Sequence, residues 1–285
     1  MESGLYVVST PIGNLADVTL RACDILRAVD VIACEDTRVT AKLLRGHSIK
    51  TPLTPYHDHN AVQVRPRLIA RLLQGKSVAL VCDAGTPLVS DPGYRLIRAA
   101  IEVGIAIIPL PGPSAAMAAL VVSGLPTDRF MFAGFAPARS AARLRMFAEL
   151  AQIKATILFF ESPKRLPACL LDMARAMGDR PAAVARELTK VYEEVRRGNL
   201  LSLAEAYNVE GPPKGEVVIV IGPPLKAQPN IEDVDRHLRS LLGTLSLRDA
   251  VDQVAGVTGI NRREVYARAL VFNESRSVPP GEKTD

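Results

Sequence analysis

Two loops combine residues that turn the chain with residues that leave backbone groups open to a ligand. The first loop, residues 82–93, reads Cys-Asp-Ala-Gly-Thr-Pro-Leu-Val-Ser-Asp-Pro-Gly, and the second, residues 111–115, reads Pro-Gly-Pro-Ser-Ala. Each follows an apolar run typical of a buried strand, residues 78–81 and 105–110. Neighbouring strand ends of an open α/β sheet form a ligand crevice. The pair therefore predicts a binding site, whereas either loop alone could be an ordinary strand-to-helix turn.

The chemistry of this site is expected to come from the bound molecule. Neither loop holds a nucleophile–base pair or a cluster of metal ligands, so the residues favour binding and positioning. His57 and His59 have no matching cysteine or acid spacing, and the four cysteines have no CxxC spacing, so no metal site is predicted. No G-x-G-x-x-G follows the first strand, which argues against a hydride-transferring dehydrogenase.

Three further polar clusters follow predicted strands. Residues 35–38 (Glu-Asp-Thr-Arg), 161–165 (Glu-Ser-Pro-Lys-Arg) and 186–190 (Arg-Glu-Leu-Thr-Lys) each place acids beside bases at a strand end. Such a cluster could orient a substrate hydroxyl, or it could be an ion pair with a helix cap. The residue types leave both interpretations open.

Positive charge is concentrated in one segment, although the net charge of the chain is only +5. Residues 38–76 hold eight lysines and arginines and one acid, whereas the last 61 residues balance at nine against nine. A basic block of this kind is typical of proteins that bind polyanions such as nucleic acid, but it can also be a solvated helix face. Charge alone does not decide between the two.

The length of 285 residues suits two domains with a small further element. Strands and helices alternate over residues 1–122, which predicts an α/β domain with a mostly parallel sheet. After the boundary Ser123-Gly-Leu-Pro-Thr127, a second α/β domain is predicted over residues 127–224. A helical tail is predicted over residues 231–275, and residues 276–285 are predicted to be disordered.

The tail contains two helix starts, at residues 246–249 and 261–264, separated by the turn Val257-Thr-Gly259. This spacing is typical of a helix-turn-helix, with Arg262, Arg263 and Arg268 on the second helix. The alternative is a helical hairpin that packs on the body or on a second subunit. The balanced charge of the tail argues against an independent nucleic-acid clamp.

The sequence predicts neither a membrane span nor a secretory signal. The longest apolar runs, such as residues 156–160 and 217–221, have the length of a strand. No basic segment precedes the first apolar run, so a signal peptide is not expected. With four cysteines lacking any paired spacing, a cytoplasmic protein fits best.

Five blocks together resemble the rRNA-methylating branch of the tetrapyrrole (corrin/porphyrin) methylase family. They are Ser9-Thr-Pro-Ile-Gly-Asn14, Cys34-Glu-Asp-Thr-Arg38, Asp83-Ala-Gly-Thr-Pro87 with Ser90-Asp-Pro-Gly93, Phe160-Glu-Ser-Pro163 and Arg186-Glu-Leu-Thr-Lys190. Parts shared with the wider family are residues 19–32, the Gly85/Pro87 turn and Pro111-Gly112 with Ser114. Corrin-type members usually carry Gly-Asp-Pro where this chain has Gly85-Thr86-Pro87, which counts against a tetrapyrrole substrate.

The resemblance implies two α/β domains with a cofactor cleft between them, a small helical C-terminal tail and a homodimer. The cofactor it implies is S-adenosylmethionine, which leaves as S-adenosylhomocysteine, and no metal is implied. The implied reaction is 2′-O-methylation of a cytidine, usually numbered 1402, in the decoding centre of 16S rRNA in the small ribosomal subunit. The cofactor contacts that it implies are Pro11, Asp83, Gly85, Leu88, Ser114, Ala115, Phe160, Leu188 and Gly215.

A ribose hydroxyl is a weak nucleophile, so a base or an orienting hydrogen bond is expected at the cleft. The candidates for this catalytic role are Glu35, Asp36, Glu161 and Lys190, and the sequence does not choose among them. RNA phosphates are expected on Arg38, Lys42, Arg65, Arg67 and Arg71, with a single-stranded or distorted target.

Three rivals remain on the same fold: a corrin-type C-methyltransferase, a diphthamide-type protein methyltransferase and a non-catalytic ribosome-binding factor. A corrin-type C-methyltransferase is expected to have an acid at the position of Thr86 and to lack the basic block. The last predicts loss of cofactor binding, which the intact Gly85 and Pro111-Gly112 loops argue against.

Overall fold

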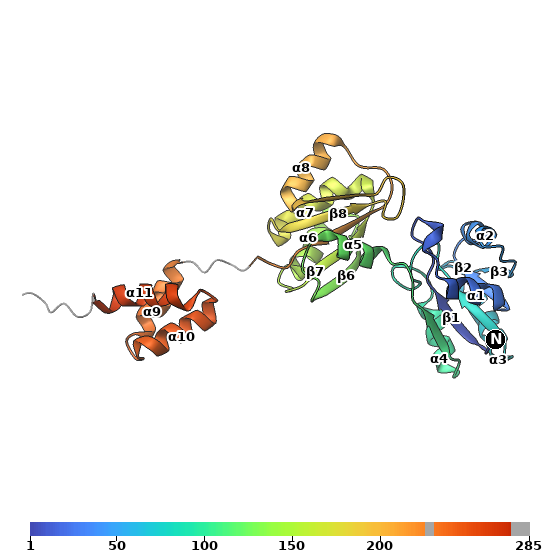
Figure 1. Ribbon diagram of the computed structural model, residues 1–285, viewed down its shortest axis with the longest axis horizontal. Helices are drawn as coiled ribbons and strands as arrows, with labels where there is room; N and C mark the ends of the chain where they lie inside the picture. Colours follow the sequence, from blue (N-terminus) through green and yellow to red (C-terminus); the bar gives the residue numbers. More distant parts are fainter. Residues whose placement is uncertain (226–230, 275–285) are drawn as a thin grey trace, which may run out of the picture. The chain divides into compact units, whose positions relative to one another are not determined.

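The structure is a computed structural model that describes residues 1–225 and 231–274, so the expected disorder of residues 276–285 lies outside the described residues. Met1–Pro224 forms one compact unit and Leu225–Asp285 a second. The first unit contains two five-stranded sheets with helices on their faces, and the second contains helices (Figure 1). The predicted α/β fold with a helical tail is confirmed.

The first sheet is parallel throughout, as the alternation of strands and helices predicts. Its strand order is β3-β2-β4-β1-β5. The strands are β1 (Gly4–Val8), β2 (Val31–Cys34), β3 (Leu53–Pro55), β4 (Ser77–Leu80) and β5 (Ile107–Leu110). The connections contain η1 (Leu15–Asp17), α1 (Leu20–Ala28), α2 (Thr37–Gly46), α3 (Ala61–Leu73) and α4 (Tyr94–Glu102).

The two faces of the first sheet are covered by different helices. Successive strand residues point to opposite sides, so Ile32 packs with α1 and α2 while Val31 and Ala33 pack with α3 and α4. Local signals start these helices: the Thr19 side chain accepts a hydrogen bond from the Ala22 N–H and caps α1. The consequence for function is that α2 and α3, which share the basic block, lie on opposite faces.

The second sheet is mixed, with strand order β6-β7-β10-β8-β9 and only β6 and β7 parallel. Its elements are β6 (Phe130–Phe135), α6 (Ser140–Leu150), β7 (Thr156–Glu161), η2 (Pro163–Arg165), α7 (Leu166–Met177), β8 (Pro181–Arg186), β9 (Glu194–Asn199), α8 (Leu200–Glu210) and β10 (Val217–Ile221). Helices α6, α7 and α8 pack on one face of this sheet. The last strand, β10, inserts between β7 and β8.

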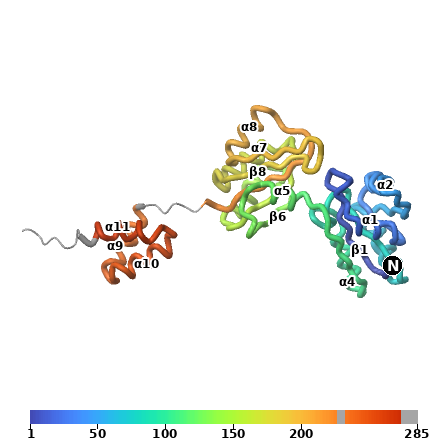
Figure 2. The backbone as a smooth tube through the Cα atoms, viewed as in Figure 1, coloured from blue at the N-terminus to red at the C-terminus, as the bar shows by residue number. Residues whose placement is uncertain are grey.

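The opposite face of the second sheet is covered by α5 (Ala115–Ser123), which follows β5 of the first sheet in the chain (Figure 2). Leu120 of α5 and Ile12, from the loop after β1, share one apolar cluster with Leu158 and Val220 of the second sheet. The two sheets are therefore joined by buried apolar contacts. The boundaries 1–122 and 127–224 remain a prediction, and α5 lies at their junction.

The helical unit consists of α9 (Ile231–Leu241), α10 (Leu247–Thr258) and α11 (Arg262–Glu274). Ser246 caps α10, and Gly259 ends it at φ 68°, the left-handed conformation that favours glycine. Arg268 pairs with Asp235 of α9 at 2.8 Å, and Arg262 pairs with Asp252 of α10. Two of the three arginines that the sequence places on the second helix thus hold their own unit together. Within the described residues, no helix has the length and apolar content that a membrane crossing needs.

Candidate functional site

The two loops singled out in the sequence line one cavity of about 440 Å³. Gly85, Ser114 and Ala115 form its wall on the first sheet, and Phe160, Leu188 and Gly215 form its wall on the second sheet. These six of the nine predicted cofactor contacts are brought together. We call this space the main cavity. Its volume lies within the range of small-molecule sites.

Hydrogen bonds tie the loops of the first sheet to one another at the main cavity. The Thr10 and Gly85 backbones exchange a pair of hydrogen bonds of 2.8 and 3.0 Å. The Thr86 hydroxyl donates to the Pro113 carbonyl at 3.1 Å and lies 3.1 Å from the Ser9 hydroxyl. One side chain therefore connects the ends of β1, β4 and β5, which places the two predicted loops at fixed positions.

Backbone strain is concentrated in two loops of this site. Leu88 and Ser90, after β4, have φ angles of 74° and 67°, and Glu187 and Thr189, after β8, have φ angles of 49° and 66°. Side chains other than glycine rarely adopt such angles, and the strain persists only where the surroundings enforce it. Ser90 and Glu187 line the main cavity, but Leu88 packs into the core of the first sheet. A cofactor contact through the Leu88 side chain is therefore not supported by its placement.

The wall of the main cavity on the second sheet contains two aromatic rings and a glycine whose position admits no side chain. Phe160 packs edge-on against Phe135, with ring centroids 5.6 Å apart, and both line the main cavity. Gly215 has φ 95°, and a Cβ atom there would lie 2.3 Å from the Glu187 carboxyl carbon. Only glycine lets Glu187 occupy this position.

Glu187 belongs to a charged network with Lys190 and Glu216. Lys190 Nζ donates to both carboxylates at 2.8 Å. The hydrogen bond from Lys190 is the largest cause that lowers the pKa of Glu187. Burial opposes the charge of Lys190, but the hydrogen bonds to both acids outweigh burial and raise the pKa of Lys190. The two carboxylates thus favour the protonated form of Lys190.

Glu161, another catalytic candidate, is buried at the floor of the main cavity. Its Oε1 accepts hydrogen bonds from the Ser162 N–H at 2.6 Å and from Arg165 Nε at 2.8 Å. Its Oε2 is buried without a hydrogen-bond partner. The carboxylate is thus paired with Arg165, which also lines the main cavity.

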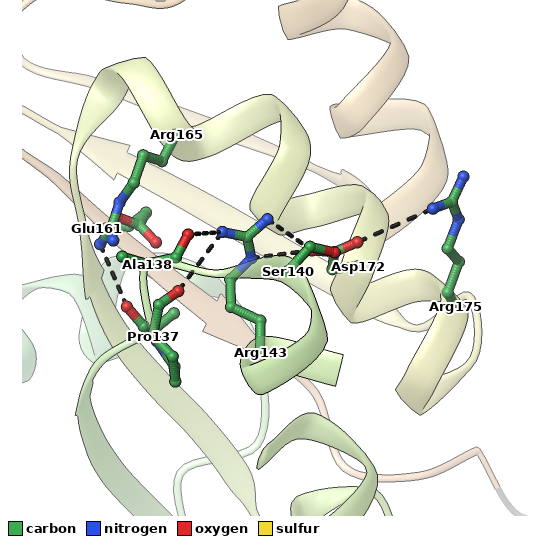
Figure 3. Close-up of polar contacts among 9 residues, drawn as sticks. Pro137, Ala138, Ser140, Arg143, Glu161, Arg165, Asp172 and Arg175 are labelled. Atoms are coloured by element: carbon green, nitrogen blue, oxygen red, sulfur yellow. Dashed lines mark hydrogen bonds and ion pairs between the residues drawn. The ribbon is translucent and has the colours of Figure 1, made fainter. Parts of the chain in front are cut away.

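Two arginines fix the loop that directly follows Phe135, the last residue of β6 and part of the aromatic wall. Arg165 donates to the Ala136 carbonyl at 3.2 Å, and Arg143 donates to the Ala138 carbonyl at 2.9 Å (Figure 3). Arg143 is itself held by Asp172 in a buried ion pair of 2.6 Å. Each arginine is thus neutralised by a buried carboxylate while it binds the loop next to Phe135.

A second cavity of about 220 Å³ adjoins the main cavity and shares the wall residues Ile12, Ala84 and Glu216 with it. Pro11 and Asp83, two predicted cofactor contacts, line this second cavity and not the main one. Lys42 of α2 and Lys190 line it as well. The structure therefore divides the predicted contacts between two neighbouring spaces.

Glu35 and Asp36 lie in a separate hollow that also contains Arg38 and Asp83. Hydrogen bonds from the Arg38 side chain lower the pKa of Asp36 to about 2. Burial, followed by the nearby carboxylates of Asp83 and Asp91, raises the pKa of Glu35. Asp36 is committed to its ion pair with Arg38, whereas Glu35 holds a proton more readily than a free side chain.

The predicted RNA-binding residues are not on one surface. Arg38 and Lys42 lie on α2, whereas Arg65, Arg67 and Arg71 lie on α3, on the opposite face of the first sheet. The basic block is continuous in the sequence only. The crossovers through α1 and α2 lie on one face and those through α3 and α4 on the other, which separates the two halves of the block.

Several residues that line the main cavity were not predicted from the sequence. Glu216, Arg165 and Phe135 line the main cavity without having been singled out individually. Arg165 sits in a polar cluster noted after a strand, whereas Phe135 resembles any other strand residue. Among the described residues, no group of three His, Cys, Asp or Glu side chains is arranged to hold a metal ion.

Comparisons with known proteins agree with this geometry. The profile of the family "Tetrapyrrole (Corrin/Porphyrin) Methylases" matches residues 4–204, and that of "RsmI C-terminal HTH domain" matches residues 228–271. A ribosomal RNA small subunit methyltransferase I from Mesorhizobium japonicum is 49% identical over 276 residues, covering 96% of this chain and 94% of the relative.

Two solved structures share the fold at low identity. Uroporphyrin-III-C-methyltransferase from Thermus thermophilus is 23% identical with a TM-score of 0.56, covering 77% of this chain and 94% of that chain. A diphthine synthase is 19% identical with a TM-score of 0.61, covering 76% and 89%. At these identities the likeness shows the fold alone.

Proposed function

The chain belongs to the tetrapyrrole (corrin/porphyrin) methylase family, and on that premise we propose that it is an S-adenosylmethionine-dependent RNA methyltransferase. The proposed acceptor is the ribose 2′-oxygen of a decoding-centre cytidine of 16S rRNA in the small ribosomal subunit. The observation that carries the proposal is the main cavity, in which the loops after β4 and β5 face Phe160, Leu188 and Gly215.

The residues of the main cavity fit the proposed cofactor. Phe135 and Phe160 offer flat apolar surfaces suited to a nucleoside base. A Cβ atom added to Gly85 would have only Ile12 at 3.5 Å and the Pro113 carbonyl at 3.9 Å near it, so the backbone is open to a ligand. When bound, S-adenosylmethionine supplies an electrophilic methyl group on a sulfonium sulfur.

The protein's own contribution is to position and to exclude water. The Thr86 hydroxyl fixes the loops on one side, and the Glu187–Lys190–Glu216 network fixes the wall on the other. A ribose hydroxyl held near the methyl group gains most of its rate from alignment, and it must lose its proton as the carbon–oxygen bond forms.

We propose that Asp36, Glu161 and Lys190 stabilise the site through their ion pairs and do not act as the base. Each is bound to an opposite charge, at Arg38, Arg165 and Glu187 respectively. Glu35 is the remaining member of the predicted set, and burial raises its pKa, which brings its proton affinity closer to that of a useful base.

The partners and setting follow from the same premise. We propose the small ribosomal subunit as substrate, a homodimer as the working form and the cytoplasm as the location. The edge strand β6 exposes Phe130 and Met131, by 45% and 36%, and a second subunit would cover them. Light scattering of the purified protein decides between a monomer and a dimer.

The test of the function is methyl transfer from labelled S-adenosylmethionine to purified small subunits that lack the modification. Nuclease digestion and mass spectrometry then identify the product. We expect 2′-O-methylcytidine. Cofactor binding without transfer to RNA would contradict the proposal and favour a small-molecule or protein acceptor.

A further inference from the structure

The second cavity has a position that the proposed reaction needs. It is separated from the main cavity only by the shared residues Ile12, Ala84 and Glu216. A group seated in it therefore lies next to whatever occupies the main cavity. At about 220 Å³, it is smaller than the sites of drug-sized ligands, which have about 300 Å³ or more, and suits a single ring better than a macrocycle.

The lining of the second cavity suits a nucleoside. Leu15, Val39 and Leu43 supply an apolar side on which a base can pack. Asp83 and Thr10 supply oxygen atoms that can hydrogen-bond with a base edge or a ribose hydroxyl. Asp83 also borders the hollow of Glu35, so it connects the candidate base to this cavity.

A row of cations leads to the second cavity. Arg38, Lys42 and Arg45 are exposed and lie at positions i, i+4 and i+7 of α2, which places them on one helix face. Lys42 lines the cavity itself. Arg38 binds Asp36 through Nε and Nη2, and because its side chain is 89% exposed, its remaining Nη1 can approach a phosphate without breaking that pair.

We propose that the second cavity is the acceptor-nucleotide subsite, which takes one unpaired ribonucleotide with its base against Val39 and Leu43 and its phosphate at Lys42. The inference rests on the proposed function, since the occupant is the nucleotide to be methylated. The cations of α2 hold the flanking single strand. A paired nucleotide does not enter, because its base is stacked within the duplex.

The first experiment fills the cavity. Val39→Trp places a large ring in it from the rim, where Val39 is 43% exposed. Val62→Trp is the matched control, since Val62 is a 65% exposed valine of α3 on the opposite face of the same sheet. We expect Val39→Trp to reduce methyl transfer to small subunits at least tenfold, with the S-adenosylmethionine Kd changed less than twofold. Val62→Trp leaves both unchanged.

The second experiment tests the phosphate contact by RNA binding without cofactor. A labelled single-stranded oligoribonucleotide of the decoding-centre sequence is titrated with Lys42→Gln and with Lys154→Gln, a control at an exposed lysine before β7. Lys42→Gln is expected to weaken binding severalfold and to reduce the slope of log Kd against log salt by about 1. Lys154→Gln should retain the slope of the unmodified chain.

The outcomes separate the subsite from the proposed function. If Val39→Trp weakens S-adenosylmethionine binding, the cavity belongs to the cofactor site and the subsite is wrong. If Val39→Trp and Val62→Trp transfer methyl groups equally, the nucleotide binds elsewhere. If the unmodified chain transfers no methyl group to RNA, the proposed function itself fails, whatever the variants do.

Discussion

Gly215→Ala tests whether the wall of the main cavity depends on one close contact. Gly215 has φ 95°, and a Cβ atom there would meet the Glu187 carboxyl carbon at 2.3 Å. Gly211, which like Gly215 precedes β10, has φ 85°, and a Cβ atom added there would meet nothing within 4 Å. Gly211→Ala therefore also forces alanine to a positive φ but without the collision, so a larger effect of Gly215→Ala reports the displacement of Glu187.

The two substitutions should lower the free energy of unfolding by different amounts, and the difference can be estimated from the hydrogen bonds that each one breaks. Both force alanine to a positive φ, which costs about 1–3 kcal/mol. Only Gly215→Ala displaces Glu187, which accepts hydrogen bonds from Lys190 Nζ at 2.8 Å and from the Glu216 N–H at 2.9 Å. At about 1 kcal/mol for each bond, Gly215→Ala should destabilise the unit by about 2 kcal/mol more than Gly211→Ala.

Urea unfolding followed by circular dichroism measures the difference in stability, and isothermal calorimetry measures the affinity for S-adenosylmethionine. Since Glu187, Leu188 and Gly215 all line the main cavity, Gly215→Ala should also weaken cofactor binding about tenfold, which corresponds to about 1.4 kcal/mol. Gly211→Ala should leave the Kd within a factor of two. Equal losses of stability in both variants, with equal Kd values, would refute the idea that this contact shapes the wall.

Three further substitutions probe other parts of the site. Thr86→Val removes the hydroxyl between the loops and should cost about 1–2 kcal/mol and weaken calorimetric cofactor binding, while Thr86→Ser should retain both. Burial and neighbouring carboxylates raise the pKa of Glu35, so the ionised side chain destabilises the folded state at a pH above that pKa. Glu35→Gln should therefore stabilise the chain by roughly 0.5 kcal/mol at pH 7. Thermal unfolding should show no such gain near pH 4, where Glu35 is protonated in both states. Arg143→Met removes the buried cation from Asp172 and leaves it with the Ser140 hydroxyl at 2.9 Å and the exposed Arg175 at 4.0 Å, which should cost about 3 kcal/mol in urea unfolding, much of which Asp172→Leu in the same chain should restore.

Much of the fold follows from local sequence signals. Apolar runs of strand length coincide with β2 (Val31–Cys34) and β6 (Phe130–Phe135), and Thr19, Ser114 and Ser246, residue types that favour a helix N-cap, start α1, α5 and α10. Helix α3 runs from Ala61 to Leu73 with Pro66 inside it, although a proline is more typical of a helix start because it cannot donate a backbone hydrogen bond. The mixed order of the second sheet could not be predicted, since β10 pairs with strands distant in the sequence.

The site was predictable where a motif and a strand end coincide, and not where tertiary packing decides. Gly85 and Ser114 meet in the main cavity because β4 and β5, which are not neighbours as the sequence suggests but flank β1, end at the same edge of the parallel first sheet. Asp83 belongs to the same motif as Gly85, and Pro11 to the block Ser9–Asn14, yet both line the adjoining cavity; Thr10, whose backbone pairs with Gly85, also lines that cavity.

The division of the basic block between two faces of the first sheet limits which of its cations one RNA strand can contact. Helices α2 and α3 are connected through β3 but pack on opposite faces of the first sheet. Residues that are close in sequence can therefore be exposed on opposite sides of the molecule. Lys42 and Arg45 then share a face with the second cavity, whereas Arg67 and Arg71 do not. A single strand that places one ribose beside the main cavity has α2 as its nearest row of cations, so the position of the cavity, and not the number of charges, selects the path of the RNA.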